Sequence, residues 1–137
     1  MNKVLVDTGP LVAILLRADE HHEVCVQTLH RLPTPLYTCW PVLTEAVWLL
    51  RFDPAAACRL LRSVEGGLLR LFELVDSEAG KIAGLLEKYG KIRPQLADAT
   101  LVHLACRERV DTIFTLDRRD FSIYRTFGNR SFRILPD

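Results

Sequence analysis

The sequence lacks the features that mark several large classes of protein. No stretch approaches the roughly 20 apolar residues that a helix needs to cross a bilayer, and no apolar segment of the secretory type is visible near the first residues. There is no GxGxxG fingerprint, no other glycine-rich phosphate loop and no Ser/His/Asp grouping, so nucleotide cofactors and covalent catalysis have no support. We therefore expect a cytoplasmic protein without a membrane segment.

The chain also has little net charge and few cysteines. The formal net charge is only +1, so any affinity for nucleic acid has to come from a local basic patch. The four cysteines lie far apart without a CxxC pair, which disfavours a zinc knuckle or disulfide framework and predicts small core residues. With 137 residues, 49% of them hydrophobic and 26% charged, the chain has the composition of one ordinary globular domain over residues 1–137.

Short apolar runs alternate with helical patterns along the chain. Pro10, Pro41 and Pro54 each stand at the expected first turn of a helix. Strands that alternate with helices indicate βα units, so the sequence predicts an α/β fold in which helices cover both faces of a mainly parallel sheet of four to five strands. The expected strands are 3–6, 36–40, 68–75, 112–116 and 132–135, and the expected helices are 11–17, 19–32, 41–50, 54–61, 77–89 and 97–109.

Four acidic residues recur at the ends and beginnings of these elements. Asp7 and Asp117 each follow an apolar strand, where open α/β sheets place their ligands, whereas Glu45 and Asp98 fall in the early turns of helices, where the helix dipole favours an anion. Taken singly, each is explained as a cap or a solvated charge. Together they predict converging carboxylates whose repulsion is relieved by protonation or by cations. Oxygen ligands without nearby His or Cys favour Mg²⁺ or Mn²⁺.

Four short segments surround these acids, namely Val4-Leu5-Val6-Asp7-Thr8-Gly9, Thr44-Glu45, Leu96-Ala97-Asp98-Ala99 and Phe114-Thr115-Leu116-Asp117-Arg118-Arg119-Asp120-Phe121. In their order along the chain they resemble the motifs of PIN-domain ribonucleases. The resemblance spans nearly the whole sequence and extends to the toxin ribonucleases of VapC-type toxin–antitoxin pairs. It implies a PIN-like three-layer α/β/α domain that hydrolyses RNA phosphodiester bonds with the help of Mg²⁺ or Mn²⁺.

The resemblance also implies roles for individual residues. The catalytic and metal-binding acids would be Asp7, Glu45, Asp98 and Asp117. Thr8 and Thr115 would support them through their hydroxyls, and Asp120 would be an additional or alternative acid. Basic residues placed to contact phosphate, or else to form a solvated rim, are Arg17, Lys91, Arg93, Arg118 and Arg119.

Partner proteins follow from the same resemblance. It implies a homodimer and a cognate antitoxin, one segment of which lies in a groove and obstructs the acids. Trp48, Leu49 and Phe52 extend the apolar surface of their helix beyond one buried stripe, so they serve such partners or complete the core.

The sequence departs from the family pattern at two places. Cys39-Trp40 precedes Pro41 where a small hydroxylated cap is more typical, and His103 stands where a small residue is common. Neither change removes an acid, so they concern helix entry, packing and partner choice. The alternative functions are a PIN-like protein-binding module without catalysis and a phosphoaspartate phosphatase. The phosphatase would need a second Asp at the position of Gly9.

Overall fold

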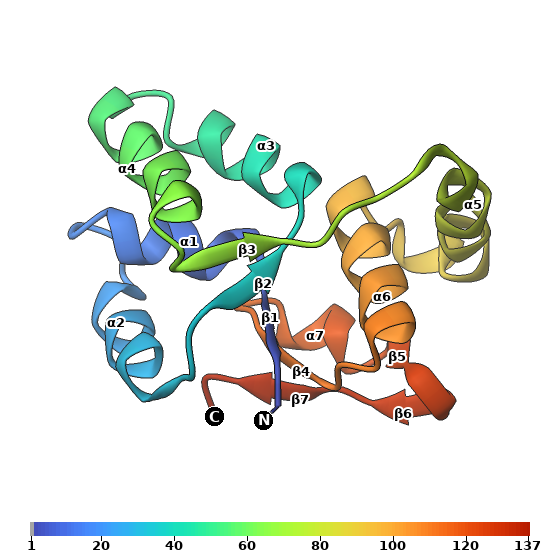
Figure 1. The fold of residues 1–137 in the computed structure, drawn as a ribbon. Helices are drawn as coiled ribbons and strands as arrows, with labels where there is room; N and C mark the ends of the chain where they lie inside the picture. Colours follow the sequence, from blue (N-terminus) through green and yellow to red (C-terminus); the bar gives the residue numbers. More distant parts are fainter. Residues whose placement is uncertain (1) are drawn as a thin grey trace.

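A single parallel sheet runs through the centre of the computed structural model, which describes residues 2–137 (Figure 1). The strand order is β3-β2-β1-β4-β7, and each pair of neighbours is parallel. The predicted α/β class and the mainly parallel sheet are therefore confirmed. The strands are β1 (Val4–Val6), β2 (Leu36–Thr38), β3 (Leu69–Leu71), β4 (Thr112–Phe114) and β7 (Arg133–Leu135).

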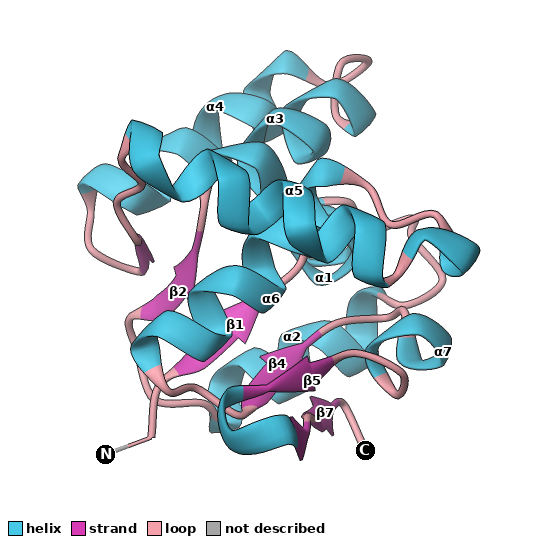
Figure 2. Ribbon diagram, turned by 90° about the vertical axis from the view of Figure 1, so that its right-hand side faces the viewer, coloured by secondary structure: helices cyan, strands magenta, loops and turns pink. Residues whose placement is uncertain are grey.

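Helices cover both faces of this sheet. Helices α1, α2 and α4 lie on one side and α5 and α6 on the other, while α3 packs against α1, α4 and α6 (Figure 1). Figure 2 views the second side, with α5 and α6 in front of the strands. No helix within residues 2–137 is long and apolar enough to cross a membrane. The bounds are α1 (Thr8–Leu15), α2 (His22–Arg31), α3 (Trp40–Leu49), α4 (Pro54–Glu65), α5 (Ala79–Lys88) and α6 (Leu96–Glu108).

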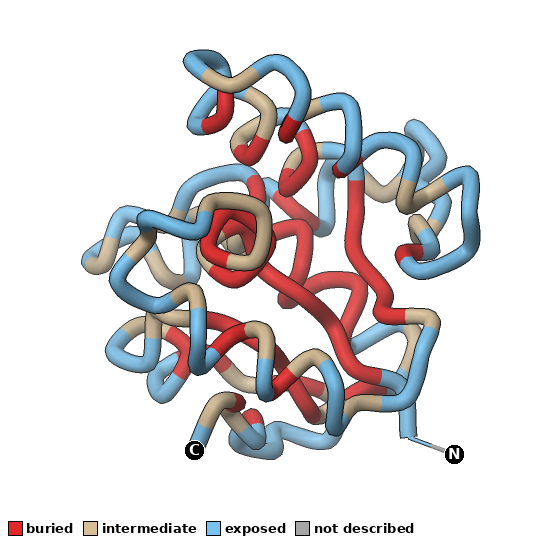
Figure 3. The backbone as a smooth tube through the Cα atoms, turned by 90° about the vertical axis from the view of Figure 1, so that its left-hand side faces the viewer, coloured by how far each residue is buried: buried red, intermediate tan, exposed pale blue. Residues whose placement is uncertain are grey.

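The central strands are buried and mostly apolar because both of their faces are covered. All three residues of β1 are buried, and so are all three of β4. The two strands pair in register, with Leu5 opposite Ile113 and Val6 opposite Phe114. Figure 3 shows buried segments running through the middle of the molecule, with exposed backbone on the outer turns. The carboxyl ends of β1 and β4 are thus held side by side by the core.

Several element bounds differ from the sequence-based expectations. The strand expected over 36–40 ends at Thr38 because Trp40 already begins α3, and the strand expected over 68–75 shortens to Leu69–Leu71. β3 is an edge strand with β2 as its only neighbour, so its pairing stops where β2 stops. The helix expected over 77–89 begins with a turn of 3₁₀-helix, η1 (Asp76–Glu78), before α5.

The sequence analysis missed several short elements near the carboxyl end. A one-turn helix, α7 (Arg118–Phe121), follows Asp117, and an antiparallel pair, β5 (Arg125–Thr126) and β6 (Arg130–Ser131), precedes β7. Two further 3₁₀ turns are η2 (Gly90–Ile92) and η3 (Phe127–Asn129). Elements of two to four residues are too short to show a hydrophobic period.

The four cysteines do not share one environment. Cys25 and Cys39 are buried, as expected, but Cys58 and Cys106 are exposed. The prediction of four core cysteines was wrong for the last two, because they lie on the outer faces of α4 and α6.

Candidate active site

Asp7 stands where β1 ends and α1 begins. Its main-chain N–H donates to the carbonyl oxygen of Phe114 at 2.9 Å and so extends the pairing of β1 with β4. Its Oδ1 accepts the main-chain N–H of Thr8 at 2.8 Å, which caps α1, and its Oδ2 accepts the hydroxyl of Thr115 at 2.8 Å. Only 7% of Asp7 is exposed, so this carboxylate is held firmly in a buried position.

Thr115 links the ends of the two central strands. Its hydroxyl donates to Asp7 and accepts the main-chain N–H of Asp117 at 3.0 Å. Asp117 in turn caps α7, because its Oδ1 accepts the N–H of Asp120 at 3.1 Å. The orientations of Asp7 and Asp117 are therefore coupled through one buried hydroxyl.

Asp98 and Glu45 come from the two helices that meet beside this edge. Asp98 is the third residue of α6, and its Oδ2 accepts the N–H of Gln95 at 3.0 Å in a reciprocal capping arrangement. Glu45 is the sixth residue of α3 and is half-buried. Asp98 thus lies in the first turn of α6 and Glu45 in the second turn of α3, so the expectation of early-turn positions was correct for both.

One cleft of about 580 Å³ collects these side chains. Its lining includes all four predicted acids, and also Asp120, Thr8 and a single basic residue, Arg93. Gly9 belongs to the same wall, where a Cβ would meet the Leu116 side chain at 3.3 Å, so glycine allows α1 to start close to the end of β4. The topology therefore gathers acids from four separate stretches of sequence.

The cleft carries more negative than positive charge, because five acids and one basic residue, Arg93, line it among the residues that the structure describes. Burial raises the pKa of Asp7 to about 6, against the lowering effect of its hydrogen bonds from Thr8 and Thr115, and repulsion from Asp98 and Glu45 adds to the rise. The pKa of Asp98 is also raised, first by burial and then by Asp117, Glu45 and Asp120. None of the five acids forms an ion pair within residues 2–137.

The donor set of the cleft fits a hard divalent cation. It offers carboxylate oxygens without His or Cys, which suits Mg²⁺ or Mn²⁺ better than zinc. Across residues 2–137, no three Asp, Glu, His or Cys side chains are gathered tightly enough to hold an ion by themselves. Mg²⁺ commonly keeps several waters and takes only one or two protein carboxylates, so the cleft as it stands is compatible with this mode of binding.

Comparison with known proteins identifies the fold family. The sequence model of the PIN-domain family matches residues 4–126 of this chain. The chain belongs to the PIN-domain family. This confirms the family resemblance of the sequence motifs.

Two relatives place this PIN domain more closely. Ribonuclease VapC26 of Mycobacterium tuberculosis (strain ATCC 25618 / H37Rv) is 32% identical to it over 135 residues, which cover 97% of this chain and 100% of VapC26. The crystal structure of VapC20 from Mycobacterium tuberculosis, a sarcin-ricin loop cleaving toxin, matches with a TM-score of 0.75 over 81% of this chain and 87% of VapC20. Because that match has 17% sequence identity, it shows a likeness of fold.

Of the predicted basic residues of this PIN domain, Arg93 lines the cleft, and Arg119 lies close enough to Asp120 to lower the pKa of that acid, which burial and Asp117 raise. Arg93, in a left-handed backbone conformation, is the one that lines the cleft. Arg118 donates instead to the carbonyl oxygen of Pro136 at 2.6 Å, next to β7. Exposed positions outside the cleft lining are occupied by Arg17, Lys91 and Arg119.

The two predicted supporting threonines of the PIN domain differ in what they contact. Thr115 bridges Asp7 and Asp117 through its hydroxyl, whereas the Thr8 hydroxyl is buried without a hydrogen-bond partner within residues 2–137. Thr8 supports Asp7 through its main-chain N–H. Sequence reasoning missed Leu49 and Gln95 in the lining, although Leu49 follows Glu45 by one helical turn and Gln95 caps the Asp98 helix.

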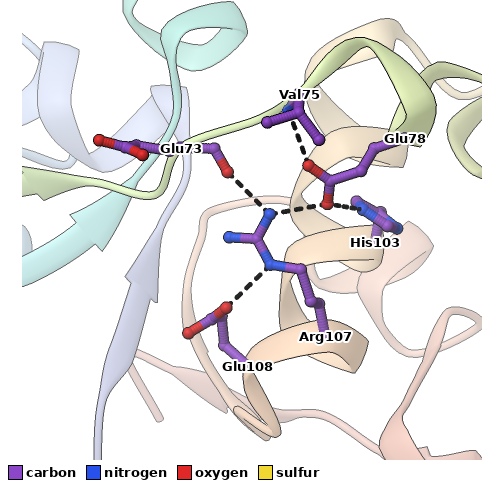
Figure 4. A network of polar contacts seen from close by, with 6 residues as sticks. All are labelled: Glu73, Val75, Glu78, His103, Arg107 and Glu108. Atoms are coloured by element: carbon purple, nitrogen blue, oxygen red, sulfur yellow. Dashed lines mark hydrogen bonds and ion pairs between the residues drawn. The ribbon is translucent and has the colours of Figure 1, made fainter.

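His103, the unusual residue of α6, belongs to a polar network behind the site (Figure 4). Its Nε2 lies 2.8 Å from Glu78 Oε1, which also accepts Arg107 Nη1 at 2.7 Å, while Glu78 Oε2 accepts the N–H of Val75 at 2.8 Å. Arg107 Nη1 donates further to the carbonyl oxygen of Glu73 at 2.7 Å. The hydrogen bond with His103, followed by those from Val75 and Arg107, lowers the pKa of Glu78 to about 2. The network ties the segment before α5 to the helix that carries Asp98.

Proposed function

We propose that this PIN domain is a metal-dependent endoribonuclease, the toxin of a toxin–antitoxin pair. Its catalytic and metal-binding residues are Asp7, Glu45, Asp98 and Asp117. One observation carries the proposal: five acids line one cleft without an ion pair within residues 2–137, and three of them, Asp7, Asp98 and Asp120, have raised pKa values. The 32% identity to a protein named as a VapC ribonuclease supports RNA as the substrate class.

The charge of the cleft argues for a cation during cleavage. An RNA phosphate that enters meets five acids and one arginine, and so is repelled unless positive charge is added. Mg²⁺ or Mn²⁺ held by Asp7, Glu45, Asp98 and Asp117 would supply that charge, together with the means to activate a water and to stabilise charge on the phosphate. The alternative of a binding module without catalysis gives no account of the unfavourable burial of Asp7.

The residues of the chain have separable tasks in this reaction. The Thr115 hydroxyl holds Asp7 and Asp117 in one orientation. The hydrogen bond from the main-chain N–H of Gln95 holds one carboxylate oxygen of Asp98 at the start of α6, and the other oxygen accepts no hydrogen bond within residues 2–137. Arg93 contacts a phosphate next to the scissile bond. Asp120 is an additional acid on the same wall.

We also propose that the protein acts in the cytoplasm and binds two partners, a second copy of itself and an antitoxin. A mainly apolar groove of about 430 Å³ adjoins the cleft and shares Glu45 and Gln95 with it. Trp40 and Trp48 line this groove and are 61% and 63% exposed, which is unusual for such large apolar side chains. We propose that the chain forms a homodimer through this groove, and that an antitoxin segment reaches the neighbouring acids.

Cleavage of labelled RNA tests the nuclease proposal. Purified wild type, Asp98→Asn and Asp76→Asn are incubated with a panel of structured RNAs in Mg²⁺, Mn²⁺ or EDTA. The panel includes a sarcin-ricin stem-loop, because the fold neighbour VapC20 is a toxin that cleaves this loop. We expect cutting by wild type with metal, none with EDTA, and a loss of at least about 100-fold in Asp98→Asn.

Asp76→Asn is the matched control, because Asp76 is exposed in η1 and lies outside the cleft lining. It should cut as wild type does. Folded wild type that cuts no RNA in any metal would favour the binding-module alternative. Full activity in Asp98→Asn would remove Asp98 from the proposed site.

A further inference from the structure

Arg118 is the first residue of α7 and directly follows the cleft acid Asp117, yet its side chain binds main-chain carbonyl groups. Its Nη1 donates to the carbonyl oxygen of Pro136 at 2.6 Å and lies 3.5 Å from that of Ile134. It forms no ion pair among the residues that the structure describes. A guanidinium that donates to a carbonyl oxygen forms a charge-assisted hydrogen bond, which is stronger than one between neutral groups. Arg118 thus attaches the start of α7 to residues 134–136.

The same segment also binds the chain just before Asp117. The main-chain N–H of Thr115, two residues before this acid, donates to the carbonyl oxygen of Leu135 at 2.9 Å. This bond continues the parallel pairing of β4 with β7. Leu135 is buried, so this contact belongs to the core. Asp117 is therefore flanked by two attachments to residues 134–136, a buried one before it and an exposed one, through Arg118, after it.

The position of α7 depends on contacts with the rest of the fold. The helix is a single turn of four residues, and an isolated turn is not stable without tertiary support. Phe121 at its far end packs edge to face on Phe132, with ring centroids 5.6 Å apart. The start of the helix, where Asp117 caps it, is instead attached through Arg118. The arginine is thus placed where it restrains the acid.

A different role for Arg118, expected from the sequence, is contact with an RNA phosphate. The residue is exposed, but it does not line the cleft, whereas Asp117 before it and Asp120 after it do. Its Nη1 is already bound to a carbonyl oxygen. The geometry therefore favours a role in positioning the neighbouring acid over contact with the reacting phosphate.

We propose that Arg118 is a positioning residue of the acidic cleft, which restrains Asp117 by anchoring the start of α7 to the carbonyl oxygens of Pro136 and Ile134. Without this anchor, the restraint on Asp117 from the side of α7 is lost, while the one through Thr115 remains. A carboxylate that is held in place before a cation arrives binds it more tightly, because less order has to be imposed on binding. The role rests on the proposed function, because it assumes that Asp117 helps to hold the divalent cation.

Removal of the donors of Arg118 tests the role. Wild type, Arg118→Met and Arg118→Lys are titrated with Mn²⁺ in a calorimeter without RNA, well below the unfolding temperature that each shows in EDTA. Met keeps a long side chain without a donor, whereas Lys keeps a charge and donors. We expect Arg118→Met to bind Mn²⁺ about threefold to tenfold more weakly, and Arg118→Lys to recover most of this affinity. In RNA cleavage, the kcat of Arg118→Met should fall while KM changes little.

Arg133→Met is the matched control, because it removes an exposed arginine from β7 itself. It should bind Mn²⁺ as wild type does. Wild-type Mn²⁺ affinity in Arg118→Met, or an equal loss in Arg133→Met, would overturn the positioning role. A raised KM for RNA with unchanged Mn²⁺ affinity would overturn it too, and would assign Arg118 to a phosphate. If wild type binds Mn²⁺ but cuts no RNA, the nuclease proposal fails while the Mn²⁺ comparison still decides the role of Arg118. Absence of Mn²⁺ binding by wild type would overturn both.

Discussion

The Asp7 side chain has two roles, because it caps α1 and is also one of the acids of the cleft. It caps α1 and accepts the Thr115 hydroxyl, which favours its charged form, while its burial favours the neutral form. The balance leaves its pKa near 6 in the protein without metal. Strain of this kind is stored at functional sites and is relieved when the missing ligand binds.

Stability of the metal-free protein should therefore fall as Asp7 ionises. Because the pKa is raised from 3.8 to about 6, the folded state binds a proton more readily than the unfolded state, and stability decreases between about pH 4 and pH 6. Asp7→Asn removes this cost. We expect the variant in EDTA to be more stable than wild type by about 1–3 kcal/mol above pH 6, and the difference to vanish below pH 4.

Urea unfolding at pH 3.5 to 8 measures this difference. Asp76→Asn, an exchange of the same kind at an exposed position, should follow the wild-type curve at every pH. A lower stability of Asp7→Asn than of wild type at pH 8 would show that the hydrogen bonds of the carboxylate outweigh its burial.

At the scale of secondary structure, α5 depends on a few contacts with α6 and with its own flanking turns. It packs against α6, η1 and η2, and only Ile82 of its residues is buried. The network of Glu78, His103 and Arg107 adds polar contacts at the start of this segment (Figure 4). The network links η1, just before α5, to the helix that carries Asp98.

Loss of the Glu78 charge should loosen this link. In Glu78→Gln we expect hydrogen exchange of residues 73–89 to become several-fold faster, because Arg107 and His103 lose their charged partner. The pKa of Glu78 is lowered to about 2 from 4.5, so its contribution is complete above pH 4.5 and is lost as the pH falls toward 2.

Hydrogen exchange with mass spectrometry at pH 7 measures the effect. Glu87→Gln on the exposed face of α5 is the control and should exchange as wild type does. Unchanged protection of residues 73–89 in Glu78→Gln would mean that apolar packing alone holds α5 in place.

At the scale of the whole molecule, the groove lined by Trp40, Trp48 and Leu96 is an apolar surface that is exposed to water. It lies next to the cleft, so a partner bound there also limits access to the acids. Large aromatic side chains at the centre of an interface often contribute about 2 kcal/mol or more to binding.

The homodimer proposal predicts that this surface controls association. We expect wild type to sediment as a dimer and Trp48→Ser to raise the dissociation constant at least about tenfold. Leu61→Ser, at a 42% exposed site on α4 outside the groove, should leave the dimer intact. Equal sedimentation of Trp48→Ser and wild type would exclude this groove as the dimer interface.

Local sequence patterns predicted much of the fold. The buried runs around Leu5 and Ile113 predicted central strands because a strand covered on both faces is mostly apolar, although β4 also contains the buried Thr112. The acids that end those runs, Asp7 and Asp117, could be assigned to the same edge because carboxyl ends of parallel strands meet there. Together with the order of the motifs, these patterns sufficed to predict the family.

Only the tertiary structure decided which side chains share the cleft and how they are oriented. Arg93 lines the cleft, while Arg118 donates to the carbonyl oxygen of Pro136, although nothing in their local sequence distinguishes these outcomes. The reason is physical: the direction of a side chain and its hydrogen-bond partners depend on atoms contributed by segments distant in sequence. By itself the sequence determined the strands, their acids and the family, whereas long-range packing determined the site.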